Sequence, residues 1–299
     1  MPLLVVGTLA YDTIETVYAR RAEVLGGSAT YFAIGASRFT PTSLVGVVGE
    51  DFRPADLELL QKCGVDTRGV EVAKGRTFRW AGRYEGDWNK RVTLETQLNV
   101  LADFDPKVPS VNRNARFLFL ANASPEVQLK ALLQVDAPAF TMIDTMNLWI
   151  EHARDALYAV LRKVDAIVLN DEEARMLTGE KNLIKAAAAV LGLGPRYVVL
   201  KKGEHGAFIM GSDLHFAIPA YPVENVVDPT GAGDSFAGGF MGYLASQKRH
   251  DPKALRQAML YGTITASYCV QAFSVEALAK LTRREIDERY DELLQIVTV

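Results

Sequence analysis

Short apolar runs alternate with segments of helical periodicity along most of the chain. The runs are rich in Val, Ile, Leu and Phe and lack a regular polar face, which is typical of parallel strands buried on both sides. We predict such strands at residues 3–6, 43–48, 117–121, 140–144, 166–169 and 196–200, and helices at 28–38, 56–63, 125–135, 252–270 and 283–297. This alternation predicts one large α/β domain spanning residues 1–299.

The pattern changes between residues 69 and 103. Residues 77–84 and 91–96 alternate apolar and polar positions around the turn-like segment 85–90, and no helical period interrupts them. Alternation of this kind predicts antiparallel strands. We therefore expect a β-rich insertion at about residues 69–103 that forms a small separate sheet.

The most informative stretch is the glycine-rich segment 228–240, Asp-Pro-Thr-Gly-Ala-Gly-Asp-Ser-Phe-Ala-Gly-Gly-Phe. It follows the extended apolar segment 223–227, which we predict to be a strand, and leads into a helical pattern at 235–244. Free amides at a helix start stabilise an anion. Asp234 would repel a phosphate, so it fits proton abstraction better than phosphate binding. The alternative is an ordinary turn in which Asp234 caps the helix.

Composition narrows the classes of function. The chain has 299 residues, 49% of them hydrophobic, a formal net charge of −3 and a pI near 5.9. A chain with this net charge offers no positive surface for nucleic acid or an anionic membrane. A bound phosphate must therefore be held by individual groups at its site. Cys63 and Cys269 form no CxxC motif, which predicts a reduced, cytoplasmic protein. No apolar run approaches the roughly 18 residues of a membrane span, and the N-terminus lacks a signal peptide's basic region.

Segment 228–240 closely resembles the signature of the ribokinase-like (PfkB) family of sugar and nucleoside kinases. The resemblance implies a three-layer α/β/α Rossmann-like fold in which the β-rich insertion is a lid over the substrate. It implies ATP-dependent transfer of a phosphoryl group to a hydroxymethyl group, with Mg²⁺ bound to the nucleotide. Asp234 would act as the base, and Gly231, Ala232 and Gly233 would supply amides to the transferring phosphoryl group.

Further segments match the family in order. The opening segment 7–12 resembles the family's first strand, whose final residue, here Asp12, binds the sugar. Gly26 and Gly27 open a helix and would lie against the acceptor. Tyr31 stands where ribose-binding members usually carry Asn, which argues against ribose, and its ring could stack on a sugar or a base. Asn122 follows a strand end, near the position of a substrate-binding acidic residue in some sugar kinases.

Two motifs point to the nucleotide. Asn170 and Glu173 match the family's Asn-x-x-Glu motif, which supports Mg²⁺ through water, although the same residues also predict an ordinary capped helix start. Lys201, Gly203 and Gly206 match the spacing of the turn that lies beneath the nucleotide phosphates in related kinases.

Three residues complete the predicted site. Thr230 belongs to the glycine-rich signature and would contact the nucleotide, whereas Asp228 and Ser274 are candidates for a monovalent cation site such as K⁺. The predicted partner is a small sugar or nucleoside, and the lid could join two subunits in a homodimer. Two alternatives stay open: a nucleoside kinase rather than a sugar kinase, and a non-catalytic sugar or nucleotide sensor. Retention of Asp234 argues against the sensor.

Overall fold

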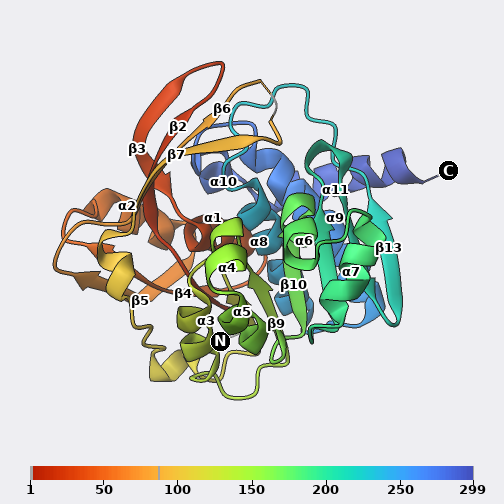
Figure 1. The fold of residues 1–299 in the computed structure, drawn as a ribbon. Coiled ribbons are helices and arrows are strands. Elements are labelled where there is room, and N and C mark those ends of the chain that lie inside the picture. Colours follow the sequence, from red (N-terminus) through yellow and green to blue (C-terminus); the bar gives the residue numbers. More distant parts are fainter. Residues whose placement is uncertain (1–2, 87, 299) are drawn as a thin grey trace.

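The computed structural model describes residues 3–86 and 88–298 and is built around a nine-stranded sheet (Figure 1). In spatial order its strands are β13 (Leu214–Ile218), β12 (Ala207–Gly211), β11 (Tyr197–Lys201), β10 (Ala166–Asn170), β9 (Phe140–Asp144), β8 (Phe117–Leu120), β1 (Leu3–Val6), β4 (Thr42–Gly49) and β5 (Val65–Ala73). From β11 to β5 neighbouring strands are parallel, and β12 and β13 add an antiparallel edge. Side chains of β1, β4 and β8 are buried on both faces, as their unbroken apolar runs predict.

Helices cover both faces of this sheet. One face carries α1 (Ser28–Ser37), α2 (Pro54–Lys62), α8 (Ala232–Gln247), α9 (Pro252–Cys269), α10 (Glu276–Lys280) and α11 (Arg283–Val297). The other carries α3 (Pro125–Leu132), α4 (Asn147–His152), α5 (Arg154–Leu161), α6 (Asp171–Thr178) and α7 (Leu183–Leu191). Each set packs into its own apolar cluster with one face of the sheet, so the predicted three-layer α/β/α architecture is confirmed. Among the described residues, none of these helices is long and apolar enough to cross a membrane.

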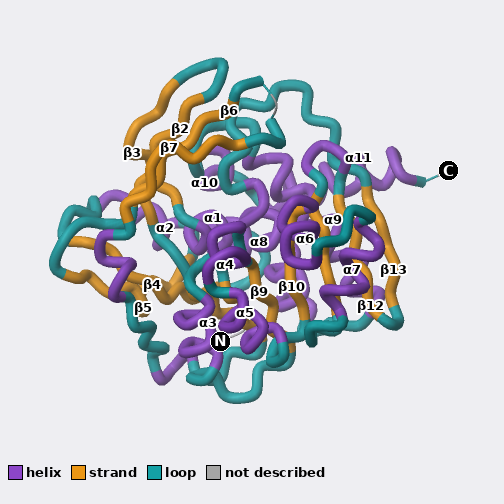
Figure 2. The backbone as a smooth tube through the Cα atoms, in the orientation of Figure 1, coloured by secondary structure: helices purple, strands orange, loops and turns teal. Residues whose placement is uncertain are grey.

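A second sheet, called the lid below, stands over one end of the main sheet (Figures 1 and 2). Its strands, in order, are β3 (Arg20–Gly26), β2 (Ala10–Glu15), β6 (Arg79–Tyr84) and β7 (Arg91–Gln97). The predicted antiparallel pair appears as β6 and β7; Asp87, in the turn between them, lies outside the described residues. The sequence did not predict β2 and β3, which supply half of the lid. Conversely, β5, at the start of the predicted insertion, belongs to the main sheet.

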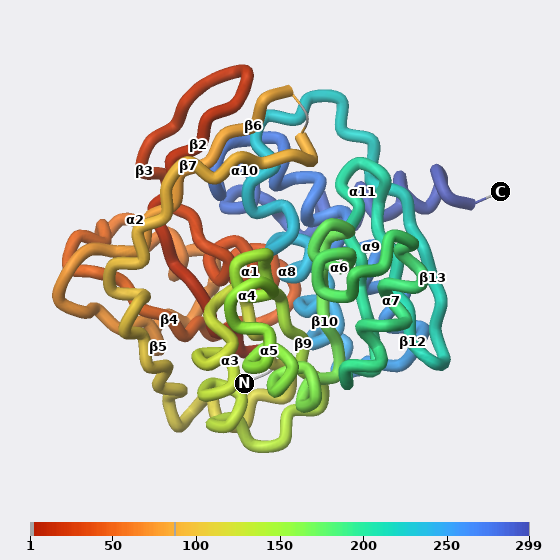
Figure 3. Tube along the Cα trace, viewed as in Figure 1, coloured from red at the N-terminus to blue at the C-terminus, as the bar shows by residue number. Residues whose placement is uncertain are grey.

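The lid packs on the body through a small apolar cluster. Ile14 of β2 and Tyr84 of β6 contact Phe273, which follows α9, and Trp80 and Trp88 pack beside them. The β6–β7 turn also reaches the turn after β11, where Asn89 donates a hydrogen bond to Glu204 (3.5 Å). The tube in Figure 3 shows the lid bending over the body on the side where α8 and α10 lie. A further contact is made near α2, where Tyr11 of β2 donates to Asp56 (2.9 Å) and Arg79 of β6 pairs with Asp51 (2.8 Å).

The predicted strand at residues 223–227 is wrong, because the described residues form no strand there. Instead, the backbone amides of Val227 and Asp228 both donate to the carbonyl of Val270, at the end of α9 (2.7 and 3.2 Å). The segment is extended because it runs past a helix terminus, and its apolar side chains pack there without a strand neighbour. These two hydrogen bonds hold the backbone in place just before the glycine-rich turn.

Candidate active site

Three adjacent parallel strands deliver polar side chains to one edge of the main sheet. Asp144 ends β9, Asn170 ends β10, and Lys201 ends β11, where it lies directly opposite Asn170 in the strand register. Carboxyl ends of parallel strands are the usual location of ligand sites in open α/β sheets. The sheet topology thus gathers an anionic, an amide and a cationic group that are far apart in sequence.

The glycine-rich turn forms the start of α8 above this edge. Gly231 is the N-cap residue with φ +77°, and a Cβ there would overlap the ring of Tyr31, so only glycine fits. The amide of Ala232 donates to the carbonyl of Pro229 (3.1 Å). The amides of Gly231 and Gly233 donate to no group among the described residues. Two of the three predicted amides are therefore available for an anion, and that of Ala232 stabilises the turn.

Asp234 lies in the first turn of α8 and is half-buried. Burial and the negative charge of Asp144 raise its pKa to about 7, against the opposing charges of Lys201 and Arg91. A carboxyl group with this pKa exchanges a proton readily near neutral pH, which suits a general base.

Lys201 is the cation at the centre of this edge. Its Nζ lies 2.6 Å from the position a Cβ would take on Gly233, so glycine there leaves room for the ammonium group. Burial lowers the pKa of Lys201, but the carboxylates of Asp144, Glu173 and Asp234 outweigh this and raise it. Lys201 is therefore charged, and it is positioned to attract a phosphate.

Asp12 is the residue predicted to bind the acceptor. It lies within β2 of the lid and not at the end of the first strand of the main sheet, and only 4% of it is exposed. A Cβ on Gly26 would overlap its carboxylate, and the amide of Gly27 donates to it. Burial and the charge of Asp228 raise the pKa of Asp12 to about 7. The Gly26–Gly27 pair thus positions the carboxylate of Asp12.

Tyr31 of α1 lies beneath the glycine-rich turn, with 1% of its surface exposed. Because its ring is covered by Gly231, it has no free face for a sugar or a base. Its buried hydroxyl has no hydrogen-bond partner among the described residues. Burial and the nearby charges of Asp12, Asp228 and Asp234 raise the pKa of this hydroxyl well above its ordinary value, so it stays protonated. The ring of Tyr31 is therefore not available for stacking, and its buried hydroxyl is left without a protein partner among the described residues.

Asn122, at the end of β8, is already engaged by neighbours. Its Oδ1 accepts a hydrogen bond from Trp149 Nε1 (2.9 Å), and its amide nitrogen donates to the sulfur of Met146 (3.1 Å). Its carbonyl accepts from Ser28 Oγ at the start of α1 (3.1 Å). Asn122 therefore lies on the predicted ligand edge, but in this structure its side chain holds Trp149 in place.

Asn170 and Glu173 form a capping box at the start of α6. The amide of Glu173 donates to Asn170 Oδ1 (2.8 Å), and the amide of Asn170 donates to Glu173 Oε2 (2.7 Å). Burial and the charge of Asp144 raise the pKa of Glu173 to about 7. The structural interpretation of this motif is thus correct. The negative charges of Glu173 and Asp144 are only partly offset by Lys201, so a bound cation would stabilise them. Among the described residues no cluster of three His, Cys, Asp or Glu side chains is suited to hold a metal by itself.

The turn after β11 contains both predicted glycines in left-handed conformations. Gly206 has φ +81°, and a Cβ there would overlap the carbonyl of Ile218. Gly203 has φ +54°, and a Cβ there would overlap Asn89 of the lid turn. Gly206 is therefore required by the packing of the sheet edge, whereas Gly203 is required by the lid.

The remaining predicted residues surround the glycine-rich turn. Asp228 is fully buried and accepts hydrogen bonds from the amides of Thr230 (2.9 Å) and Ser274 (3.3 Å). Ser274 has φ +56°, and its hydroxyl donates to the carbonyl of Leu25. Thr230 Oγ1 lies 3.3 Å from the hydroxyl of Tyr84 in the lid. Asp228 and Ser274 are thus adjacent, and Thr230 joins the turn to the lid.

The structure brings to the site three residues to which sequence reasoning assigned no role: Asp144, Arg91 and Trp149. Asp144 ends a buried strand, a signal that could have identified it in the same way as the other strand-end residues. Arg91 and Trp149 come from the lid and from α4, and their positions depend on packing between distant segments that no local pattern reports.

Most of the chain matches one known protein family. The sequence profile of the pfkB family carbohydrate kinases matches residues 3–280. The chain belongs to this family. As a PfkB-family kinase, it is a phosphotransferase that acts on an alcohol group of a sugar or a nucleoside.

Individual relatives support the same assignment. A cytidine kinase of Thermococcus kodakarensis is 31% identical over 247 residues, covering 81% of this PfkB chain and 87% of the relative. An E. coli structure assigned to a ribokinase II, in complex with ATP and Mg²⁺, superimposes with a TM-score of 0.80 at 20% identity over 97% of this chain and 99% of that chain. A Burkholderia thailandensis nucleoside kinase in complex with inosine superimposes with a TM-score of 0.77 at 20% identity over 98% and 99% of the two chains. These two structures confirm the ribokinase-like fold.

Proposed function

We propose that this PfkB-family protein phosphorylates the hydroxymethyl group of a nucleoside, with ATP as the donor. One observation carries the proposal of catalysis: Asp234 lies at a helix start beside the unbonded amides of Gly231 and Gly233. A base and an anion site at this spacing suit proton removal from an alcohol with simultaneous charge stabilisation on a phosphoryl group. The choice of a nucleoside is supported by the similarity to a cytidine kinase and by Tyr31 in place of the Asn of ribose-binding members.

The residues divide into two groups along the reaction. Asp12, placed by Gly26 and Gly27, accepts hydrogen bonds from acceptor hydroxyls. Asp234 takes the proton of the attacking hydroxyl, and the amides of Gly231 and Gly233 stabilise the transferring group. Lys201 attracts the donor phosphates as a point charge.

The carboxylates of Asp144 and Glu173 fit a divalent cation. Burial raises the pKa of both, and the charge of Asp144 raises that of Glu173 further, so a cation between them and the phosphates would relieve uncompensated charge. Mg²⁺ keeps several waters when it binds with a nucleotide, and Glu173 and Asn170 would hold such waters. When bound, Mg²⁺ neutralises charge on the phosphates. We also propose a monovalent cation, such as K⁺, near Asp228 and Ser274, supported by their adjacency.

We infer further that residues 1–299 form one kinase domain with its lid, and that the lid joins two subunits. The support for a dimer is the strand β7, which lies at the edge of the lid sheet and leaves Val92 and Leu94 each 45% exposed. An exposed edge strand with apolar side chains pairs readily with another strand. A cytoplasmic location is supported by the two free, buried thiols of Cys63 and Cys269.

The test is ADP release from ATP and Mg²⁺ over a panel of sugars and nucleosides. We expect turnover with cytidine or another nucleoside to exceed that with ribose or fructose, and Asp234→Asn to lower kcat by about 10²- to 10⁴-fold with the best acceptor. Faster turnover with a free sugar would contradict the nucleoside assignment. Tight ligand binding without turnover would contradict the enzyme function and favour a sensor.

A further inference from the structure

Arg91 projects from the inner face of the lid toward the glycine-rich turn. In the register of β6 and β7, Arg91 is the direct partner of Tyr84. Directly paired residues of antiparallel strands share a face of the sheet. The hydroxyl of Tyr84 lies 3.3 Å from Thr230 Oγ1, the residue before Gly231. Arg91 therefore shares the face of the lid that touches the phosphoryl-binding turn.

The guanidinium of Arg91 is held by an aromatic ring. Trp80 lies flat along β6, because a Cβ on Gly82 would overlap its ring, and Trp80 Nε1 donates to Thr93 Oγ1 (3.4 Å). The guanidinium carbon of Arg91 lies 5.2 Å from the centroid of this ring. Among the described residues, no carboxylate lies within ion-pair distance of Arg91. A cation–π contact thus orients Arg91 while its hydrogen-bond donors stay free for a ligand.

The geometric placement of Arg91 agrees with the charges that it acts on. Its positive charge opposes the raised pKa of Asp12, of Asp234 and of Glu173, of which burial is the main cause. Arg91 thus lies on the face of the lid that contacts Thr230, and its charge acts on carboxyl groups of both the lid and the body.

The site holds more negative than positive groups, so a second cation would stabilise it. Five buried or half-buried carboxylates surround it, Asp12, Asp144, Glu173, Asp228 and Asp234, whereas the body supplies Lys201 from the sheet edge. A nucleoside triphosphate adds several negative charges. A guanidinium is planar and forms paired hydrogen bonds to phosphoryl oxygens, which suits charge spread over three equatorial oxygens during transfer.

We propose that Arg91 is a catalytic residue delivered by the lid, and that its guanidinium contacts the phosphoryl group during its transfer. The lid is then part of the catalytic machinery as well as a cover. This inference rests on the proposed function, because it requires phosphoryl transfer at the glycine-rich turn.

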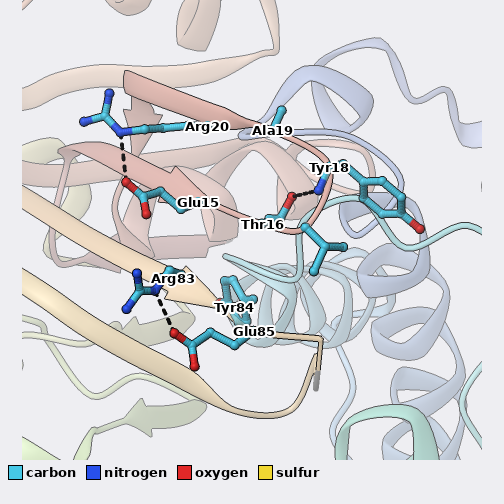
Figure 4. Close-up of a pocket in the computed structure, with 9 residues that line it drawn as sticks. Glu15, Thr16, Tyr18, Ala19, Arg20, Arg83, Tyr84 and Glu85 are labelled. Carbon is cyan, nitrogen blue, oxygen red and sulfur yellow. Dashed lines mark hydrogen bonds and ion pairs between the residues drawn. The ribbon is translucent and has the colours of Figure 1, made fainter.

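The experiment compares Arg91→Ala with Arg83→Ala in steady-state ADP release with the best acceptor. Arg83 is a matched control: it lies on the same strand pair but is paired with Glu85 (2.9 Å), as Figure 4 shows, at the rim of an open hollow of about 550 Å³ near the lid tip. We expect Arg91→Ala to lower kcat by about 10²-fold, with the acceptor KM within threefold of wild type, and Arg83→Ala to leave both unchanged. Added guanidinium ion should restore part of the rate of Arg91→Ala and none for Arg83→Ala.

Three results would overturn the inference. They are a kcat of Arg91→Ala within threefold of that of Arg83→Ala, a raised acceptor KM with unchanged kcat, and full activity of Arg91→Gln, which keeps a planar hydrogen-bonding group but is shorter and uncharged. The last variant also serves if Arg91→Ala fails to fold. Absence of turnover in the wild-type protein would instead contradict the proposed function, so the two failures are distinguishable.

Discussion

At the scale of single residues, the site contains several carboxyl groups whose pKa lies close to neutral pH. Asp12, Glu173 and Asp234 each have a pKa raised to about 7, chiefly by burial. Lys201 lies among them and stays charged. Because the carboxylates repel one another without a ligand, binding of cations and phosphates changes the charge state of the whole set.

The pH dependence of turnover follows from Asp234. A base must be deprotonated to act, and its pKa of about 7 means that the active form is lost as the pH falls. We therefore expect kcat/KM to be constant well above pH 7 and to fall about tenfold per pH unit below it. ADP release measured from pH 5.5 to about 9 checks this.

Asp234→Asn is the control for that profile, since Asp12 and Glu173 titrate in the same range. The residual rate of the variant should lack the part of the pH dependence that belongs to the base. An unchanged acid limb in Asp234→Asn would assign the limb to the other carboxyl groups and contradict the role of Asp234.

At the scale of elements, the contact between the lid and the turn after β11 depends on a glycine. Gly203 leaves room for Asn89 of the β6–β7 turn, which donates to Glu204 beside it. We expect Gly203→Ala to displace the lid tip and to raise the acceptor KM by roughly three- to tenfold, measured by ADP release. The φ of +54° adds a backbone cost of about 1 kcal/mol, which should lower the melting temperature slightly.

A double variant separates these two effects. Asn89→Ala removes the side chain that the new methyl group meets, so Asn89→Ala/Gly203→Ala should recover most of the acceptor KM while keeping the lower melting temperature. If the double variant binds acceptor as poorly as Gly203→Ala, the steric coupling between lid and turn is not what sets acceptor affinity.

The sequence predicted correctly those elements that can be recognised from a few neighbouring residues. The Asn170–Glu173 motif predicts a capped helix start, and the buried runs of the main sheet were found because an unbroken apolar run needs no partner to be recognised. The strands Ala10–Glu15 and Arg20–Gly26 were missed because one of them pairs with β6, 68 positions away. The apolar segment 223–227 resembled a strand, yet a helix end supplies its hydrogen-bond acceptor.

The site residues likewise fall into those that a local motif identifies and those that only tertiary contacts reveal. Asp234, Asp12 and Lys201 could be named from the sequence because each stands in a motif, although their mutual charge coupling could not be inferred. The burial of Tyr31 beneath Gly231 and the bond from Trp149 to Asn122 arise from contacts between separate segments. Sequence thus indicated the chemistry, and tertiary packing determined which side chains remain free to perform it.

At the scale of the whole molecule, the edge of the lid predicts a dimer. We expect sedimentation equilibrium to give a homodimer, because β7 exposes apolar side chains at an unpaired edge. Leu94→Lys should shift the protein to monomers, whereas Leu133→Lys, at a site that is 68% exposed on the body, should leave the dimer intact. A wild-type monomer at micromolar concentration, or a Leu94→Lys dimer, would contradict a lid-mediated assembly.

Asp12 and Arg91 both lie on the lid, whereas Asp234, Glu173 and Lys201 lie on the body. Under the proposed function, a molecule whose lid had moved away from bound ATP would lack the acceptor's carboxylate partner and the lid's positive charge at the same moment. Water that reached the nucleotide would then meet an incomplete site. The division of the proposed active site between lid and body would therefore guard against futile hydrolysis of ATP in the absence of the alcohol.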